Sequence, residues 1–157
     1  MPNNTIKINQ QIIPVPWSDI EVYSLKIARW IERTFGDADD KDCPLRNLDV
    51  KIYGIPRGGM IPAILVSHIL ETKYKFNVRF IPSLDHLTPK DMHRLVVIDD
   101  ICDSGETFKI VKQLFPMAKT AVLFRREGAG FQTDFHCHTI VDDRWLVFPW
   151  EVNDGEV

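Results

Sequence analysis

The stretch from residue 94 to residue 107 has the sequence RLVVIDDICDSGET. Its apolar run, Leu95 to Ile98, is typical of a strand that is buried in a parallel sheet. Two adjacent carboxylates, Asp99 and Asp100, follow this run directly, and Asp103 comes soon after them. The last four residues form a small polar turn that opens into a helical pattern. A strand, an acidic pair, a glycine turn and a helix start, in this order, predict a phosphate cradle beside a metal and a sugar.

Each part of this stretch predicts its own chemistry. Backbone N–H groups near the expected helix start favour a phosphate dianion, and the residues that supply them are Ser104, Gly105, Glu106 and Thr107. Asp99 and Asp100 repel a phosphate, so they are suited either to ribose hydroxyls or to Mg²⁺ that bridges to a pyrophosphate. Asp103 can accept a proton from a base nitrogen.

Composition and charge limit the class of protein. The chain has 157 residues, of which 45% are hydrophobic and 26% charged, as in a soluble globular protein with one core. The net charge of −3 indicates no basic face for nucleic acid. No apolar run approaches the roughly 20 residues that span a membrane. The N-terminus lacks a signal-peptide pattern and three cysteines cannot all pair, so we expect reduced cysteines and a cytoplasmic location.

Strand and helix patterns alternate along the chain. Strands are predicted over 50–55, 76–82, 95–98, 119–124 and 138–142. Helices are predicted from Ser18 or Asp19, either of which can cap the first turn, to Gly36, and over 60–72 and 107–115. This alternation predicts one α/β domain over 1–157, with a mainly parallel sheet flanked by helices. Loops at the carboxyl ends of its strands should meet at one edge, and they contain Arg57, Ser83, Asp99 and Arg126.

Four segments resemble the type I phosphoribosyltransferases, and most closely the xanthine-guanine enzymes. Residues 96–107, VVIDDICDSGET, resemble the motif that binds 5-phosphoribosyl pyrophosphate (PRPP). Residues 54–62, GIPRGGMIP, resemble the pyrophosphate loop and the helix after it, and Ser83-Leu84-Asp85-His86 resembles the start of the flexible catalytic loop. Trp145-Leu146, with Pro149-Trp150, resembles the purine-binding segment. The matches keep the family's order and spacing over roughly residues 17–152.

The resemblance implies a fold and a reaction. The expected fold is the type I phosphoribosyltransferase fold, with a core over about 17–142 and a small C-terminal hood over about 143–152. The expected reaction transfers the 5-phosphoribosyl group from PRPP to a 6-oxopurine (guanine, xanthine or hypoxanthine) and releases pyrophosphate, with Mg²⁺ as the cofactor. The resemblance also implies a homodimer or a homotetramer.

The resemblance further implies a role for each matching residue. Arg57 would contact the pyrophosphate, and Gly58 would let the backbone approach it closely, in a loop that often holds a non-proline cis peptide. Asp103 would face N7 of the purine as proton acceptor, and Asp100 would hold the metal ion. The purine would be bound by three residues, of which one stacks, one reads an exocyclic group and one faces the 6-oxo group: Trp145, Leu146 and Arg126.

Two departures from the family keep other functions open. The segment from Ser83 to His93 is shorter than the family's lid, which excludes water, and Leu84 stands where the family has a tyrosine. A regulatory protein that binds PRPP or a nucleotide without transfer, or a nucleotide N-glycosidase, therefore remains an alternative. Arg126 stands near the family's lysine and presents a planar fork instead of a point donor.

Two other polar clusters have a structural and a functional interpretation. His136-Cys137-His138 has metal-ligand residue types, but alternation along a strand would send Cys137 to the face opposite both histidines, which favours a strand edge. Asp142 and Asp143 either form a turn or help to place Mg²⁺ or the hood.

Overall fold

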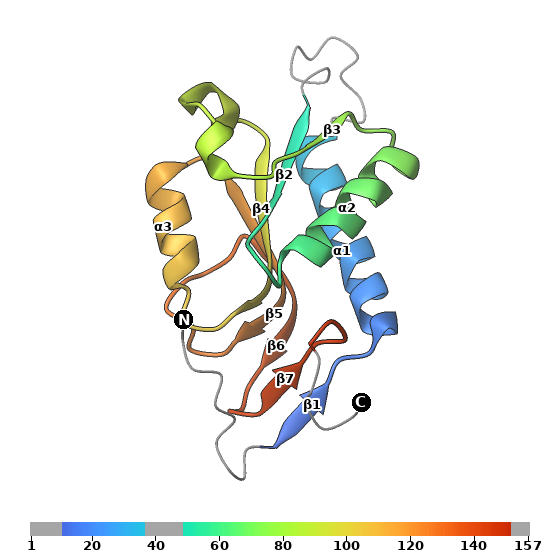
Figure 1. Cartoon of the computed structure of the whole chain (residues 1–157), viewed down its shortest axis with the longest axis vertical. Helices are drawn as coiled ribbons and strands as arrows, with labels where there is room; N and C mark the ends of the chain where they lie inside the picture. The colour runs from blue at the N-terminus through green and yellow to red at the C-terminus, as the bar shows by residue number, and fades with distance from the viewer. Residues whose placement is uncertain (1–10, 37–48, 152–157) are drawn as a thin grey trace.

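The computed structural model describes residues 11–36 and 49–151, and a five-stranded sheet with helices on both faces forms its centre (Figure 1). The elements in chain order are β1 (Ile12–Pro14), α1 (Trp17–Phe35), β2 (Val50–Gly54), α2 (Met60–Thr72), β3 (Val78–Phe80), the 3₁₀ helices η1 (Leu84–His86) and η2 (Pro89–Met92), β4 (Leu95–Cys102), α3 (Glu106–Leu114), β5 (Lys119–Arg126), β6 (Phe135–Ile140) and β7 (Trp145–Val147).

The five-stranded sheet is parallel throughout and has the order β3-β2-β4-β5-β6. Its middle strand is β4, in which Val96 lies opposite Ile52 of β2 and Lys119 of β5. The four residues Leu95–Ile98 are completely buried, as expected for a strand covered on both faces. The predicted parallel sheet is therefore confirmed, and its central strand carries the acidic pair at its carboxyl end.

Alternate residues of β4 face two separate hydrophobic cores. Val96 and Ile98 pack with residues of α1 and α2 on one face of the sheet, whereas Leu95 and Val97 pack with residues of α3 on the other. Figure 1 shows α1 and α2 together on one side of the sheet and α3 on the opposite side. The two faces thus hold β4 in place from both sides.

β7, which lies in the segment predicted as a hood, pairs with a strand that was not predicted. β7 pairs in parallel with β1, and Ile12 lies opposite Trp145. The N–H of Val15 extends this ladder by donating to the Val147 carbonyl over 2.8 Å. The segment 12–14, for which no strand was predicted, therefore pairs with β7, and we call these two strands and the turn after β7 the hood. The hood lies at the same end of the sheet as the carboxyl end of β4 (Figure 1).

Element boundaries differ from the prediction at several places. Neither Ser18 nor Asp19 caps α1, because the helix already begins at Trp17; Pro16 is its N-cap, and the Pro16 carbonyl accepts the N–H of Asp19. The end at Gly36 is confirmed. β4 and β5 run beyond the predicted ranges, to Cys102 and Arg126, because backbone pairing continues through polar residues. No helix in the described ranges is long and apolar enough to cross a membrane.

Candidate active site

The acidic pair lies in the last part of β4, where both carboxylates are largely buried. Asp99 accepts the N–H of Asp100, and Asp100 accepts the N–H of Ile101, each over 2.8 Å. Burial, followed by the negative charge of Asp100, raises the pKa of Asp99 well above its usual range. Burial also raises the pKa of Asp100, and the charge of Glu151 adds to this shift. The paired carboxylates therefore form a site that a cation or a set of hydroxyl donors would stabilise.

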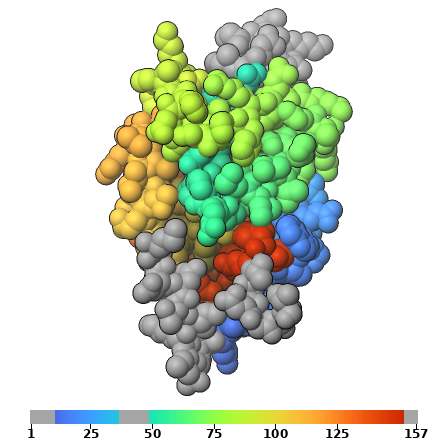
Figure 2. Space-filling model, viewed as in Figure 1, coloured from blue at the N-terminus to red at the C-terminus, as the bar shows by residue number. Residues whose placement is uncertain are grey.

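The loop after β2 packs its backbone directly against this pair. A side chain at Gly58 would collide with the Asp100 carboxylate, and a Cβ at Gly59 would lie 2.8 Å from the Cα of Asp99. The peptide bond between Pro56 and Arg57 is cis, as the resemblance implied. Arg57 itself is exposed. Figure 2 shows β2 and this loop (teal) beside the hood (red) on one face of the molecule.

The turn after β4 leads into α3 through Gly105, whose φ of +83° lies in the left-handed region. Any side chain here would also collide with Phe131, so both the backbone angle and the packing require glycine. Ser104 accepts the N–H of Glu106 over 3.4 Å, and Glu106 pairs with Lys109 over 2.8 Å. The predicted phosphate residues therefore lie together at the start of a nine-residue helix.

Arg126, at the end of β5, joins Asp103 to the hood. Its Nε lies 2.9 Å from an Asp103 carboxylate oxygen. Its two terminal nitrogens donate to the main-chain carbonyls of Asp142 and Arg144, the second over 3.2 Å. A single, largely buried guanidinium therefore fixes the side chain of Asp103 and the loop that leads into β7.

A pocket of about 200 Å³ lies between the acidic strand and the hood, and we call it the hood pocket. Its lining residues are Asp100, Ile101, Asp103, Arg126, Trp145, Leu146, Phe148 and Glu151. The carboxylates and the guanidinium line one side, and the hood supplies the apolar residues. An aromatic ring with hydrogen-bonding groups at its edge matches this lining.

Sequence reasoning missed Glu151 as a pocket residue. Its carboxylate accepts the N–H of Phe148 over 2.8 Å, and its charge acts on Asp100. In the sequence Glu151 begins an acidic C-terminal tail, which resembles an ordinary solvated end. Its place in the pocket depends on the turn after β7, and the only available signal was its closeness to the aromatic cluster around Trp150.

Some predicted site residues lie apart from the hood pocket. Ser83 is the N-cap of η1 and accepts the N–H of Asp85 over 3.3 Å, and neither Ser83 nor Arg57 lines the pocket. Cys137 packs with the core and donates to the carbonyl of Tyr23 over 3.5 Å, whereas His136 contacts Thr139. Within the described residues, no group of three or more His, Cys, Asp and Glu side chains could hold a metal ion by itself.

Comparisons with known proteins identify the family. No protein-family model matches the chain. The xanthine-guanine phosphoribosyltransferase of Gluconobacter oxydans is 31% identical over 120 aligned residues, and the match covers 64% of this chain and 67% of that enzyme.

Solved structures identify the fold. A purine phosphoribosyltransferase from Pyrococcus horikoshii superposes with a TM-score of 0.69 at 23% identity, over 92% of this chain and 96% of that one. A hypothetical protein from Neisseria gonorrhoeae with bound ppGpp superposes with a TM-score of 0.64 at 19% identity, over 94% and 93% of the two chains. Sequence and fold agree, and the chain belongs to the purine phosphoribosyltransferases with the type I fold.

Proposed function

We propose that the protein transfers the 5-phosphoribosyl group of PRPP to a 6-oxopurine (guanine, xanthine or hypoxanthine) and releases pyrophosphate. The observation that carries this proposal is the hood pocket, in which the Asp103–Arg126 pair faces Trp145 and Leu146. A purine ring stacked on Trp145 would direct its polar edge toward that pair. The name of the Gluconobacter relative supports a xanthine or guanine substrate.

The two phosphate groups of PRPP would be bound by two different loops. The 5′-phosphate fits the start of α3, where the backbone of residues 104–107 and the helix dipole favour an anion. The pyrophosphate fits the loop after β2, where Arg57 is exposed and Gly58 leaves the backbone open. Asp99 and Asp100, which lie between the two loops, would then bind the ribose hydroxyls.

Mg²⁺ fits the acidic pair. Mg²⁺ is commonly held by one or two carboxylates together with substrate phosphates and water, so it needs no three-residue cage. Asp99 and Asp100 supply such carboxylates, and burial raises the pKa of both, so a bound cation would stabilise their ionised form. Asp100 would hold the ion together with the ribose and pyrophosphate oxygens. When bound, the ion would neutralise the charge that develops on the leaving pyrophosphate.

The chain's own residues would guide the transfer. N9 of the purine forms the bond to C1′ as the bond from C1′ to the pyrophosphate oxygen breaks, and the N7 proton passes to Asp103. Arg126 holds the Asp103 carboxylate toward the pocket and donates to the 6-oxo oxygen once the purine enters. The transition state carries positive charge on the ribose, so positioning and nearby carboxylates lower its free energy.

The short segment after β3 favours a second candidate function. Residues 83–93 form only η1 and η2, which leaves little chain to close over PRPP. A protein that binds a nucleotide without efficient transfer would need no such lid. The structural neighbour from Neisseria gonorrhoeae carries ppGpp, and nucleotide binding on this fold supports that alternative.

Product identification after incubation with PRPP, Mg²⁺ and one purine at a time separates these functions. We expect nucleoside monophosphate and pyrophosphate with guanine, xanthine or hypoxanthine, and about 10²- to 10⁴-fold slower formation of nucleotide by Asp103→Asn. A folded protein that makes no nucleotide from these bases or adenine would contradict the proposal. Tight nucleotide binding by calorimetry without turnover would select the regulatory function, whereas release of base and ribose 5-phosphate from a nucleotide would identify an N-glycosidase.

Self-association is a separate part of the proposal. Exposed apolar side chains on and after α3, namely Ile110, Leu114 and Met117, form a face suited to contact between copies. We expect a dimer or tetramer by light scattering during size-exclusion chromatography, and a monomer at micromolar concentration would contradict it.

A further inference from the structure

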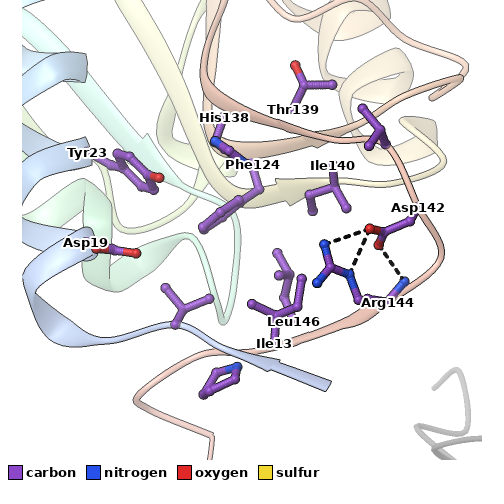
Figure 3. A pocket seen from close by; sticks show the side chains of 13 residues that line it. Ile13, Asp19, Tyr23, Phe124, His138, Thr139, Ile140, Asp142, Arg144 and Leu146 are labelled. Carbon is purple, nitrogen blue, oxygen red and sulfur yellow. Dashed lines mark hydrogen bonds and ion pairs between the residues drawn. The ribbon is translucent and has the colours of Figure 1, made fainter. Parts of the chain in front are cut away.

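A second pocket, of about 240 Å³, adjoins the hood at Leu146, which also lines the hood pocket (Figure 3). Its walls come from α1, from β1 and β7 of the hood, and from the ends of β5 and β6 with the loop after β6. We call it the α1 pocket. None of the roles proposed above uses the residues of α1 that line it.

The α1 pocket has an apolar middle and two polar ends. Figure 3 shows Phe124 between Asp19 and Tyr23 on one side and the Asp142–Arg144 pair on the other. The Tyr23 ring packs edge-on against Phe124, with centroids 5.3 Å apart. Burial, followed by the charge of Asp19, raises the pKa of Tyr23, so its hydroxyl keeps its proton and remains a donor.

The opposite end holds an ion pair, Arg144 with Asp142, whose side chains are 46% and 35% exposed. Arg144 pairs with the carboxylate of Asp142 over 2.7 Å, and that carboxylate also accepts the Arg144 N–H over 3.0 Å. This contact uses part of the donor fork of Arg144 and leaves other N–H groups for a ligand. One end of the pocket therefore favours a cation or a donor, and the other offers donors to an anion or an acceptor.

We propose that the α1 pocket binds a small molecule with an aromatic or otherwise apolar middle and a charged group at each end. The cationic group would lie at Asp19 and the anionic group at Arg144. The apolar middle would lie on Phe124 and Leu146, which are 5% exposed each. The volume suits a molecule of about the size of an amino acid or a single substituted ring.

Ligand in the α1 pocket would act on the hood pocket through two shared features. Leu146 lines both pockets. The side chains of Asp142 and Arg144 line the α1 pocket. The main-chain carbonyls of the same two residues accept from Arg126, which in turn holds Asp103. Binding at one pocket therefore alters binding at the other, and this coupling rests on the proposed nucleotide function of the hood pocket.

A ligand with the required charges is available as a probe. 4-(Aminomethyl)benzoate carries an ammonium and a carboxylate at opposite ends of one ring, and benzylamine and benzoate each carry one of these groups. In amide chemical-shift titrations of the full chain, we expect the zwitterion to bind with a dissociation constant on the order of 1 mM. Each half-probe should bind about tenfold more weakly, with shifts in α1, β6 and the 141–146 region.

Variants test both ends of the α1 pocket. Asp19→Asn should weaken the zwitterion and benzylamine about fivefold and leave benzoate unchanged, whereas Arg144→Gln should weaken the zwitterion and benzoate. Glu21→Gln, on the same helix but outside the pocket, is the matched control and should change nothing. Tyr23→Phe keeps the ring packing and removes only the hydroxyl, so it tests the same end if Asp19→Asn does not fold.

The coupling is measured with GMP, whose affinity should change at least twofold when the probe is saturating. The proposal would be overturned if each of the three probes bound Asp19→Asn and Tyr23→Phe with the same affinity as it binds the unchanged protein. Shifts confined to residues 100–103, 126 and 148–151 would also overturn it, because they would place the probe in the hood pocket. A protein without transferase activity would refute the proposed function and leave these probe titrations unaffected.

Discussion

The two sides of the candidate active site are built in different ways. On the phosphate side, the loop after β2 and the loop after β4 meet through their backbones, and Gly58 lies against the carboxylate of Asp100. On the purine side, β1 and β7 come from opposite ends of the described chain and pair over only three residues each. The link between this hood and the sheet includes two donor contacts from one side chain, Arg126, to main-chain carbonyls, and its third contact holds Asp103.

This difference teaches how each side should respond to substitution. Backbone close packing leaves no space for an added methyl group, so even the smallest change on the phosphate side should be costly. A hood tied by side-chain hydrogen bonds can adjust, so substitution there should change affinity in a graded way. Asp103 belongs to both sides, because it follows the acidic pair in sequence and pairs with Arg126 in space.

The largest expected effect comes from Asp103→Asn. The amide keeps an oxygen that can accept from Arg126 and loses the ability to take a proton, so kcat should fall about 10²- to 10⁴-fold. The dissociation constant of PRPP, measured by calorimetry, should change by less than about threefold. Equal losses in kcat and PRPP affinity would show that Asp103 acts in binding and would place it on the phosphate side alone.

Gly58→Ala tests the phosphate side. The added methyl group would collide with the Asp100 carboxylate, and overpacking of this kind costs about 1–3 kcal/mol, or roughly 5- to 150-fold in affinity. We expect that loss in the PRPP dissociation constant, with the binding of free purine unchanged.

Gly128→Asn is the control for this variant. A side chain at Gly128 meets nothing within 4 Å, and asparagine tolerates the positive φ of this position, +78°. Its PRPP affinity should match that of the unchanged protein. Equal PRPP affinities for Gly58→Ala and Gly128→Asn would refute the close packing of the phosphate side.

Arg126→Lys tests the purine side with a smaller expected effect. A lysine ammonium keeps the charge, but it cannot hold Asp103 and two hood carbonyls with a planar fork. The KM for the purine should rise about tenfold, whereas PRPP affinity stays within about twofold. Arg79→Lys, at an exposed arginine that pairs with Asp91, is the matched control. An unchanged or lower purine KM would show that the lysine of the family serves this hood equally well.

The phosphate side could be predicted from the sequence because its signals are contiguous. The acidic pair, Gly105 and the start of α3 follow one another in a single stretch, and α2 occupies 60–72 as predicted. Local patterns specify such elements because side-chain period, turn chemistry and burial all act within a few residues.

The purine side could be predicted only in part. Trp145 and Leu146 were identified, but β1 was not, because a three-residue strand has little pattern and its partner lies more than 130 residues away. Glu151 and the carbonyl partners of Arg126 were also missed. Every residue has a main-chain carbonyl, so the residue types do not show which carbonyls accept from Arg126. Only the folded chain could reveal that one arginine connects the hood to Asp103.

Alkylation of Cys137 should change activity least. The rate of this alkylation reports on the packing of β6 beneath α1. Burial raises the pKa of this thiol to about 12, so at pH 8 only about one thiol in ten thousand is ionised, against roughly a quarter of free cysteines. Because the thiolate is the reactive form, iodoacetamide should modify Cys137 on the order of 10³-fold more slowly than free cysteine at pH 8. The rate should rise about tenfold per pH unit from pH 8 to 10.

Peptide mapping of the Cys43→Ser variant, with and without 6 M guanidinium, would measure this rate. Cys102, on the phosphate side, is 1% exposed and donates to the Phe131 carbonyl, so its modification requires opening of the turn after β4. Mg-pyrophosphate should slow Cys102 and leave Cys137 unchanged, because it would bind only the phosphate side. Equal protection of both cysteines by Mg-pyrophosphate would show that the turn after β4 and the packing of β6 beneath α1 open together, so that motion on the phosphate side would not be confined to its own backbone-packed loops.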